Sequence, residues 1–144
     1  MTDSTVMHKP KSDDCSYIAL SSETNGAYSL MELVVPPGGG PPPHTHLFED
    51  EGFYVLAGTF KLWVAGKDPV EVKVGEHAFG PRGIEHYFRN MGETPGRLML
   101  IFSPGGCEGY FVELAEVRAT EGDNLLEKEE AIDKKYGMLI NRRN

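Results

Sequence analysis

Apolar side chains recur at every second position in several segments through the middle of the chain, and this pattern predicts antiparallel strands. The segments 53–57, 60–64 and 70–74 each place apolar side chains at every second position. Period-two alternation is typical of strands that bury one face and expose the other. The run 98–102 is apolar throughout, which predicts a strand covered on both faces.

Turn signals divide these segments at short, regular intervals. Residues 17–20 and 27–35 also have strand character, and a turn that contains Asn25-Gly26 separates them. The segment 36–43 reads PPGGGPPP, which is unsuited to a helix or a central strand and predicts a loop. Many short strands with such spacing are typical of a β-sandwich or a β-barrel.

The last third of the chain has a different pattern, which predicts two short helices. The first covers 110–118, and the second begins near Asn124, where Glu127 completes the spacing of a capping box. Gly137 follows at the position of a C′ glycine. One apolar stripe of the second helix is formed by Leu125, Ile132 and Tyr136. We interpret the acidic run 127–133 as the solvated face of this helix.

Length and composition indicate one soluble domain. The chain has 144 residues, of which 40% are hydrophobic, and we assign all of it to a single domain. Within it, 1–16 is a flexible tail, 17–107 the strand-rich part and 108–144 the helical part. No run of about 20 apolar residues and no secretory signal is visible, so we expect a cytoplasmic protein and no membrane contact.

Charge and cysteine content narrow the functional classes further. The formal net charge is −8, and no basic stripe offsets it, so nucleic acid is an unsuitable partner. The two cysteines, Cys15 and Cys107, lie far apart, and we expect both to be reduced thiols.

Four residues form a candidate metal site. His44 and His46 are two apart, so on an extended chain both imidazoles point to the same side. Glu51 shares the parity of Phe53 and the other residues assigned to the interior, and His86 lies on a later strand that could face or adjoin the histidine pair. Three imidazoles and one carboxylate suit Fe, Mn, Ni, Co, Cu or Zn.

The same residues carry a resemblance to a known family. Residues 38–58 read G-x5-H-x-H-x4-E-x6-G, and residues 75–90 read G-x5-P-x-G-x2-H-x3-N. The two patterns resemble the two motifs of the cupin superfamily. The resemblance implies an all-β, jelly-roll-type cupin β-barrel with short C-terminal helices. It also implies that His44, His46, Glu51 and His86 bind one divalent metal ion. Gly58 and Gly83 would be turn residues, and Asn90 a structural residue.

More narrowly, the chain is similar to small single-domain cupins of the quercetin-dioxygenase-like group. That similarity implies an oxygenase acting on a small, largely apolar or phenolic/enol substrate, with Glu51 as both ligand and catalytic proton acceptor. The alternatives are a non-catalytic small-molecule-binding cupin and a non-redox metal isomerase or decarboxylase. Single-domain cupins commonly pair, so we also expect a homodimer.

Several neighbouring residues have plainer interpretations. Glu49 and Asp50 could compete with Glu51 for the ion, but Asp50 would point outward and Glu49 lies within the turn. His77 reads as a structural or surface residue, and Arg82 as a turn residue that could meet an anionic substrate. The aromatic residues Phe48, Phe53, Tyr54, Phe60 and Phe79 could line a pocket, although a core role is the simpler reading for each. The loop 36–43 and the turn 81–83 are expected near the opening of the site.

Overall fold

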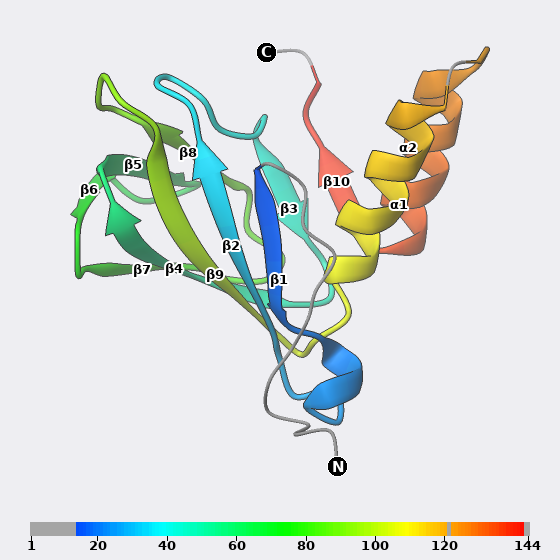
Figure 1. Ribbon diagram of the computed structural model, residues 1–144, viewed down its shortest axis with the longest axis horizontal. Coiled ribbons are helices and arrows are strands. Elements are labelled where there is room, and N and C mark those ends of the chain that lie inside the picture. The colour runs from blue at the N-terminus through cyan, green and yellow to red at the C-terminus, as the bar shows by residue number, and fades with distance from the viewer. Residues whose placement is uncertain (1–13, 121, 143–144) are drawn as a thin grey trace.

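The computed structural model describes residues 14–120 and 122–142 (Figure 1). Residues 1–13 of the predicted N-terminal tail, 1–16, lie outside the described residues. Residues 15 and 16 of that predicted tail belong to strand β1 (Cys15–Ala19). Among the described helices, none is long and apolar enough to cross a membrane.

The strands form two five-stranded sheets, and every strand pairing is antiparallel. The first sheet has the order β1, β2 (Ser29–Val35), β9 (Gly96–Ser103), β4 (Asp50–Ala57) and β7 (His77–Gly80). The second has the order β10 (Met138–Ile140), β3 (His44–His46), β8 (His86–Asn90), β5 (Thr59–Val64) and β6 (Val70–Lys73). A 3-10 turn (Ser21–Glu23) follows β1. These two sheets make the predicted jelly roll.

The hydrophobic core is built from the alternating positions that the sequence pattern marks as inward. Both sheets contribute residues to one buried cluster, which includes Phe53 and Val55 of β4, Phe60 of β5 and Leu100 of β9. Because the cluster draws on strands from each sheet, burial of one face per strand holds the sheets together.

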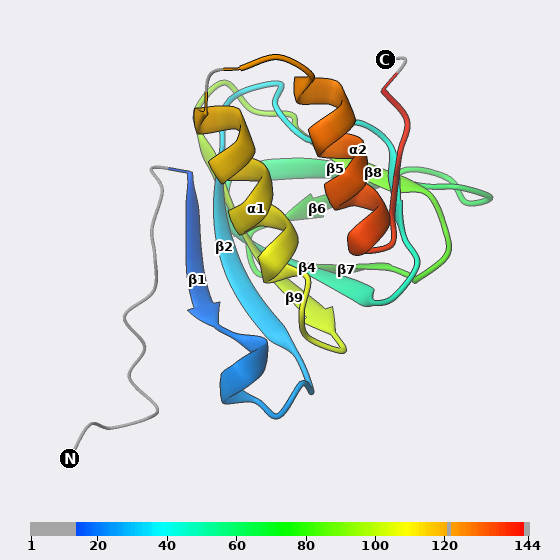
Figure 2. The same cartoon turned by 90° about the vertical axis from the view of Figure 1, so that its right-hand side faces the viewer.

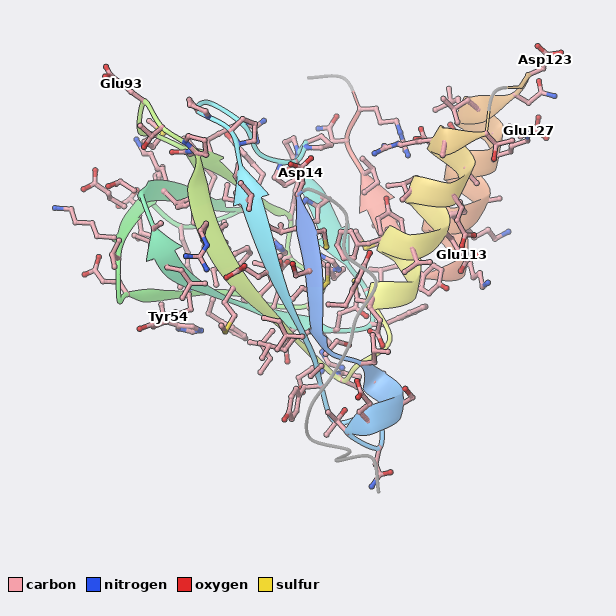
Figure 3. All side chains as sticks on the ribbon, viewed as in Figure 1. Asp14, Tyr54, Glu93, Glu113, Asp123 and Glu127 are labelled. Atoms are coloured by element: carbon pink, nitrogen blue, oxygen red, sulfur yellow. The ribbon has the colours of Figure 1, made fainter. Side chains whose placement is uncertain are left out.

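Strand β9 departs from the prediction that both of its faces are covered. Leu98, Leu100 and Phe102 are buried, but Ile101 between them is 39% exposed. The helices lie on another side of the molecule and do not cover this outer surface (Figures 1 and 2). Tyr54 of the neighbouring strand is also exposed and points away from the sheet (Figure 3). An apolar run therefore signalled a central strand here, and not a strand covered on both sides.

Both predicted C-terminal helices are present, as α1 (Glu108–Ala119) and α2 (Leu125–Lys135). They lead into a strand that the sequence pattern did not indicate, β10, which pairs with β3 so that Met138 lies opposite His46. Figures 1 and 2 show the two helices side by side, with β10 returning toward β3. The end of the chain therefore reaches the strand that carries the histidine pair.

The expected details of α2 are only partly present. Gly137 has a positive φ of 67°, as a C′ glycine requires. The capping box is wrong, because Asn124 has a left-handed backbone and makes no side-chain cap bond. Leu125 is exposed and does not join the buried stripe, whereas Ile132 packs with Tyr110 in a small second core.

The acidic run of α2 is not fully solvated, which corrects a further expectation. Glu129 and Asp133 are both buried. Asp133 accepts a hydrogen bond from the Tyr110 hydroxyl at 2.9 Å and pairs with Arg142 at 2.7 Å, while Glu129 pairs with Arg118 at 2.5 Å. Burial of these carboxylates is compensated because each has a hydrogen-bonded cationic partner.

Candidate metal centre

The structure brings the four predicted site residues together between the two sheets. His44 and His46 lie on β3, and His86 lies on the adjacent β8, directly opposite His44 in the antiparallel register. Glu51 reaches the same point from β4 of the other sheet. One potential ligand atom from each residue lies within 4.8 Å of all the others, and all four residues are buried.

The approach of Glu51 to the imidazoles is close. Its Oε1 lies 2.9 Å from Nε2 of His86 and 3.1 Å from Nε2 of His46. Gly80 faces Glu51 across the strand pair, and a Cβ at Gly80 would lie 3.1 Å from the His86 ring. A glycine at this position therefore leaves room for the second-motif histidine.

The other ring nitrogen of each histidine is anchored by an oxygen acceptor. Nδ1 of His44 lies 2.9 Å from the Pro42 carbonyl, and Nδ1 of His86 lies 3.0 Å from the Ile84 carbonyl. Nδ1 of His46 lies 2.9 Å from Oε1 of Glu49. A carbonyl or carboxylate oxygen can only accept, so each Nδ1 carries the proton and donates it.

This arrangement needs either a proton or a metal ion at its centre. With Nδ1 protonated, a neutral imidazole presents the lone pair of Nε2, and two such lone pairs would face the Glu51 carboxylate at about 3 Å. The contact is favourable only when a proton or a metal ion lies between the acceptors. Three oriented imidazoles and a carboxylate are the donor set of many catalytic transition-metal sites, so the residues fit a divalent metal ion.

The pKa values of the metal-free cluster reflect the same geometry. Burial lowers the pKa of His44 to about 4. Burial alone would lower the pKa of His46 too, but hydrogen bonds with Cys107, Glu49 and Glu51 raise it to about 12. Burial would raise the pKa of Glu51, yet its hydrogen bonds with His46 and His86 lower it to about 2. Glu51 is therefore ionised at neutral pH.

Two residues behind His46 were not identified as partners from the sequence. Glu49 is 5% exposed and bonds His46 from the side away from Glu51, so it orients a ligand and does not compete with Glu51. The Sγ of Cys107 lies 3.8 Å from the same Nδ1, and burial raises the pKa of this thiol to about 12. Neither of the two described cysteines, Cys15 and Cys107, takes part in a disulfide. The only sequence signal for Glu49 is its position three residues after His46.

A cavity of about 760 Å³ opens onto the site. Its walls include His44, His46 and Glu51, and the predicted loop contributes Pro36, Gly40, Pro41 and Pro42. The turn 81–83 is not among the residues that line the cavity. The Gly83 amide donates to the His46 carbonyl, and Arg82 is held by Asp50 and by the Ser103 carbonyl.

The side chains that line the cavity differ from the aromatic residues considered from the sequence. Phe53 and Phe60 are core residues, and Phe48 and Phe79 are exposed. Phe88 and Phe111 line the cavity instead, together with the aliphatic residues Leu33, Leu100, Leu114, Met138 and Ile140. Three arginines, Arg89, Arg118 and Arg142, also line it and were not anticipated. His77 is exposed on β7 opposite Tyr54, in agreement with a surface role.

Comparison with known proteins identifies the family. Residues 31–102, half of the chain, match the family model described as Cupin domain. The chain therefore belongs to the cupin family, and the matched region contains all four residues of the candidate metal centre.

Individual relatives match only part of this chain or have low sequence identity to it. Germin-like protein subfamily 2 member 2 of Arabidopsis thaliana is 35% identical over 79 residues, which are 52% of this chain and 36% of that protein. Quercetin 2,3-dioxygenase of Bacillus subtilis is 24% identical over 128 residues, which are 82% of this chain and 37% of the relative. The matches thus span little more than a third of each of these relatives. KdgF from Halomonas sp. has the same fold, with a TM-score of 0.58 at 19% identity, over 66% of this chain and 81% of that one.

Proposed function

We propose that the protein is a metal-dependent cupin oxygenase that acts on a small, largely apolar substrate with a phenolic or enol oxygen. His44, His46, Glu51 and His86 would hold the metal ion. The observation that carries the proposal is the set of three imidazoles, each anchored through Nδ1, which face one buried carboxylate beside an apolar cavity.

When bound, a metal ion of this type supplies coordination for a substrate oxygen and for dioxygen. The residues of the chain would position the ligand atoms, exclude water and accept a proton. The anchored imidazoles keep their Nε2 atoms fixed, and the apolar wall excludes water from the reacting end of the substrate. Glu51 is ionised at neutral pH and lies within the cluster, so its carboxylate can accept the proton of a substrate hydroxyl.

The relatives give this proposal limited support. One of them is a quercetin 2,3-dioxygenase that aligns over 82% of this chain, but another is a germin-like protein. A second candidate is a non-redox isomerase or decarboxylase. The three arginines in the cavity wall favour it, because such reactions use cationic groups to hold a carboxylate or phosphate.

Elemental analysis of the purified protein, followed by oxygen-electrode assays with a panel of phenolic and enol substrates, tests the proposal. We expect about one metal ion per chain and substrate-dependent oxygen uptake. The Glu51→Gln variant should bind metal and lose uptake, because an amide cannot accept the proton. Turnover without oxygen consumption would support the isomerase or decarboxylase instead.

A further inference from the structure

Arginine side chains are concentrated around the cavity. Arg89 on β8, Arg118 on α1 and Arg142 just after β10 all line it, and no lysine does so among the described residues. These are three of only six arginines in a chain whose formal net charge is −8. The accumulation of guanidinium groups at this place is therefore not a consequence of overall composition.

The three guanidinium groups differ in whether a carboxylate pairs with them. Arg118 and Arg142 pair with Glu129 and Asp133, and neither of those carboxylates lines the cavity. Within the described chain, Arg89 has no carboxylate at ion-pair distance. Its Nη1 instead donates to the backbone carbonyls of Pro41, at 2.5 Å, and Phe88, at 2.7 Å.

Arg89 is tied to the same short loop as a metal ligand. The carbonyl of Pro41 accepts from Arg89, and the next carbonyl, that of Pro42, accepts from Nδ1 of His44. Gly40 permits this contact, because a Cβ there would lie 1.9 Å from the Phe88 carbonyl oxygen and 2.8 Å from Nη1 of Arg89. The guanidinium is thus positioned by the loop that also orients the candidate metal centre.

We propose that the substrate of this site carries a carboxylate, which Arg89 binds with the support of Arg118 and Arg142. Each guanidinium uses one nitrogen in the bonds described above, so its other N–H groups can meet an anion. Arginine binds a carboxylate through two parallel hydrogen bonds, which a lysine cannot reproduce. The carboxylates that line the cavity are Asp14 and Glu51, and Glu51 belongs to the metal cluster.

The inference rests on the proposed function for the position of the reacting end. An oxygen of the substrate would lie at the metal, its apolar body against Leu33, Leu100 and Phe111, and its carboxylate at Arg89. The substrate class is therefore an apolar or phenolic carboxylic acid, and not a neutral flavonol.

Isothermal titration with a matched pair of probes tests this assignment. Caffeate has a catechol that can coordinate metal and a separate carboxylate, and methyl caffeate lacks only the charge. Protein loaded with Zn²⁺ is used, because zinc is redox-inert and no turnover can occur. We expect the wild type to bind caffeate about tenfold more tightly than the ester. In Arg89→Gln this preference should fall below about threefold, with the ester affinity nearly unchanged.

Two further variants separate recognition from folding. Arg97→Gln removes the same charge from β9, where Arg97 pairs with Glu32 away from the cavity wall, and should retain the full preference. Arg118→Lys keeps a cation beside the buried Glu129, so it should fold normally, but lysine cannot form two parallel hydrogen bonds with a carboxylate and should lower the preference by about threefold. It keeps the test decisive if Arg89→Gln is unstable.

Equal binding of acid and ester by the wild type would overturn the inference, as would a lack of binding of both probes at millimolar concentration. An unchanged preference in Arg89→Gln and Arg118→Lys would do the same. Oxygen uptake is measured separately. A protein that prefers the acid through Arg89 but consumes no oxygen with it would keep this inference and lose the oxygenase. Uptake without acid preference would do the reverse.

Discussion

Replacing Glu49 by glutamine should weaken metal binding without removing any ligand. Glu49 is buried, and its Oε1 accepts the Nδ1 proton of His46 at 2.9 Å. His44 and His86 donate to neutral backbone carbonyls instead, so His46 is the one imidazole of the cluster whose Nδ1 proton is accepted by a negatively charged group. A glutamine side chain has the same size as glutamate and can still accept that hydrogen bond, but it lacks the charge.

The expected loss follows from what such outer partners contribute elsewhere. Removing a hydrogen-bonding partner of a metal-bound histidine typically costs about 10- to 100-fold in metal affinity. At 25 °C this corresponds to about 1.4–2.8 kcal/mol of binding free energy. Glu49 is buried and the bond is short, so solvent screens the effect little, and we expect Glu49→Gln to lose at least about tenfold.

Competition against a chromophoric chelator measures this affinity directly, with Zn²⁺ or Co²⁺ as the ion. Glu93→Gln is the matched control, since Glu93 is exposed at the tip of a loop far from the site (Figure 3). Thermal melts of the metal-free variants establish that both fold. Equal affinity of wild type and Glu49→Gln, with both folded, would refute the reasoning, because the charge behind His46 would then have no effect on the ion.

The other predictions concern the ligands, pH and assembly. His86→Ala should reduce metal binding by at least about 100-fold, whereas His77→Ala should leave it nearly intact, as chelator competition will show. Bound metal should also raise the melting temperature, because it binds the folded chain alone. Metal-free protein should lose stability as pH falls from about 6.5 to about 4, since the unfolded chain protonates His44 and the folded chain does not. The loss due to His44 should reach about 2 kcal/mol between pH 7 and pH 5, and denaturant titrations of wild type and His44→Gln at these two pH values check it. Light scattering at micromolar concentration should give the mass of a homodimer, and a monomeric mass would contradict that expectation.

The candidate ligands could be predicted because strand periodicity is a local property. The spacing of two between His44 and His46 places both imidazoles on one side of β3, whatever the rest of the fold does. Glu51 could be assigned inward because it has the parity of Phe53, which packs in the core. His86 required one more step, the pairing of β8 with β3, which the resemblance of its motif supplied.

Other features depend on contacts that no local pattern encodes. Strand β10 has three residues, too few for periodicity, and its pairing with β3 is set by the helices that precede it. Asp133 has a charge that predicts exposure, but Tyr110 on α1 and Arg142 just after β10 reach it from other elements of the fold. Burial of such a residue can be understood only when its partners are known.

The cavity wall combines residues from the region that matches the family with residues from the rest of the chain. The motif residues lie on strands that the hydrophobic core holds in register, so the candidate metal centre is built from the part of the chain that matches the family. Arg118, Met138 and Arg142 lie beyond residue 102, outside that match, and yet they face the same cavity. Residues that touch a substrate away from the metal decide which substrate is accepted, whereas the ion decides which chemistry is possible. Substitutions of Arg118 and Arg142 should therefore change substrate preference and leave metal affinity intact, whereas substitutions of the histidines on β3 and β8 should weaken metal binding.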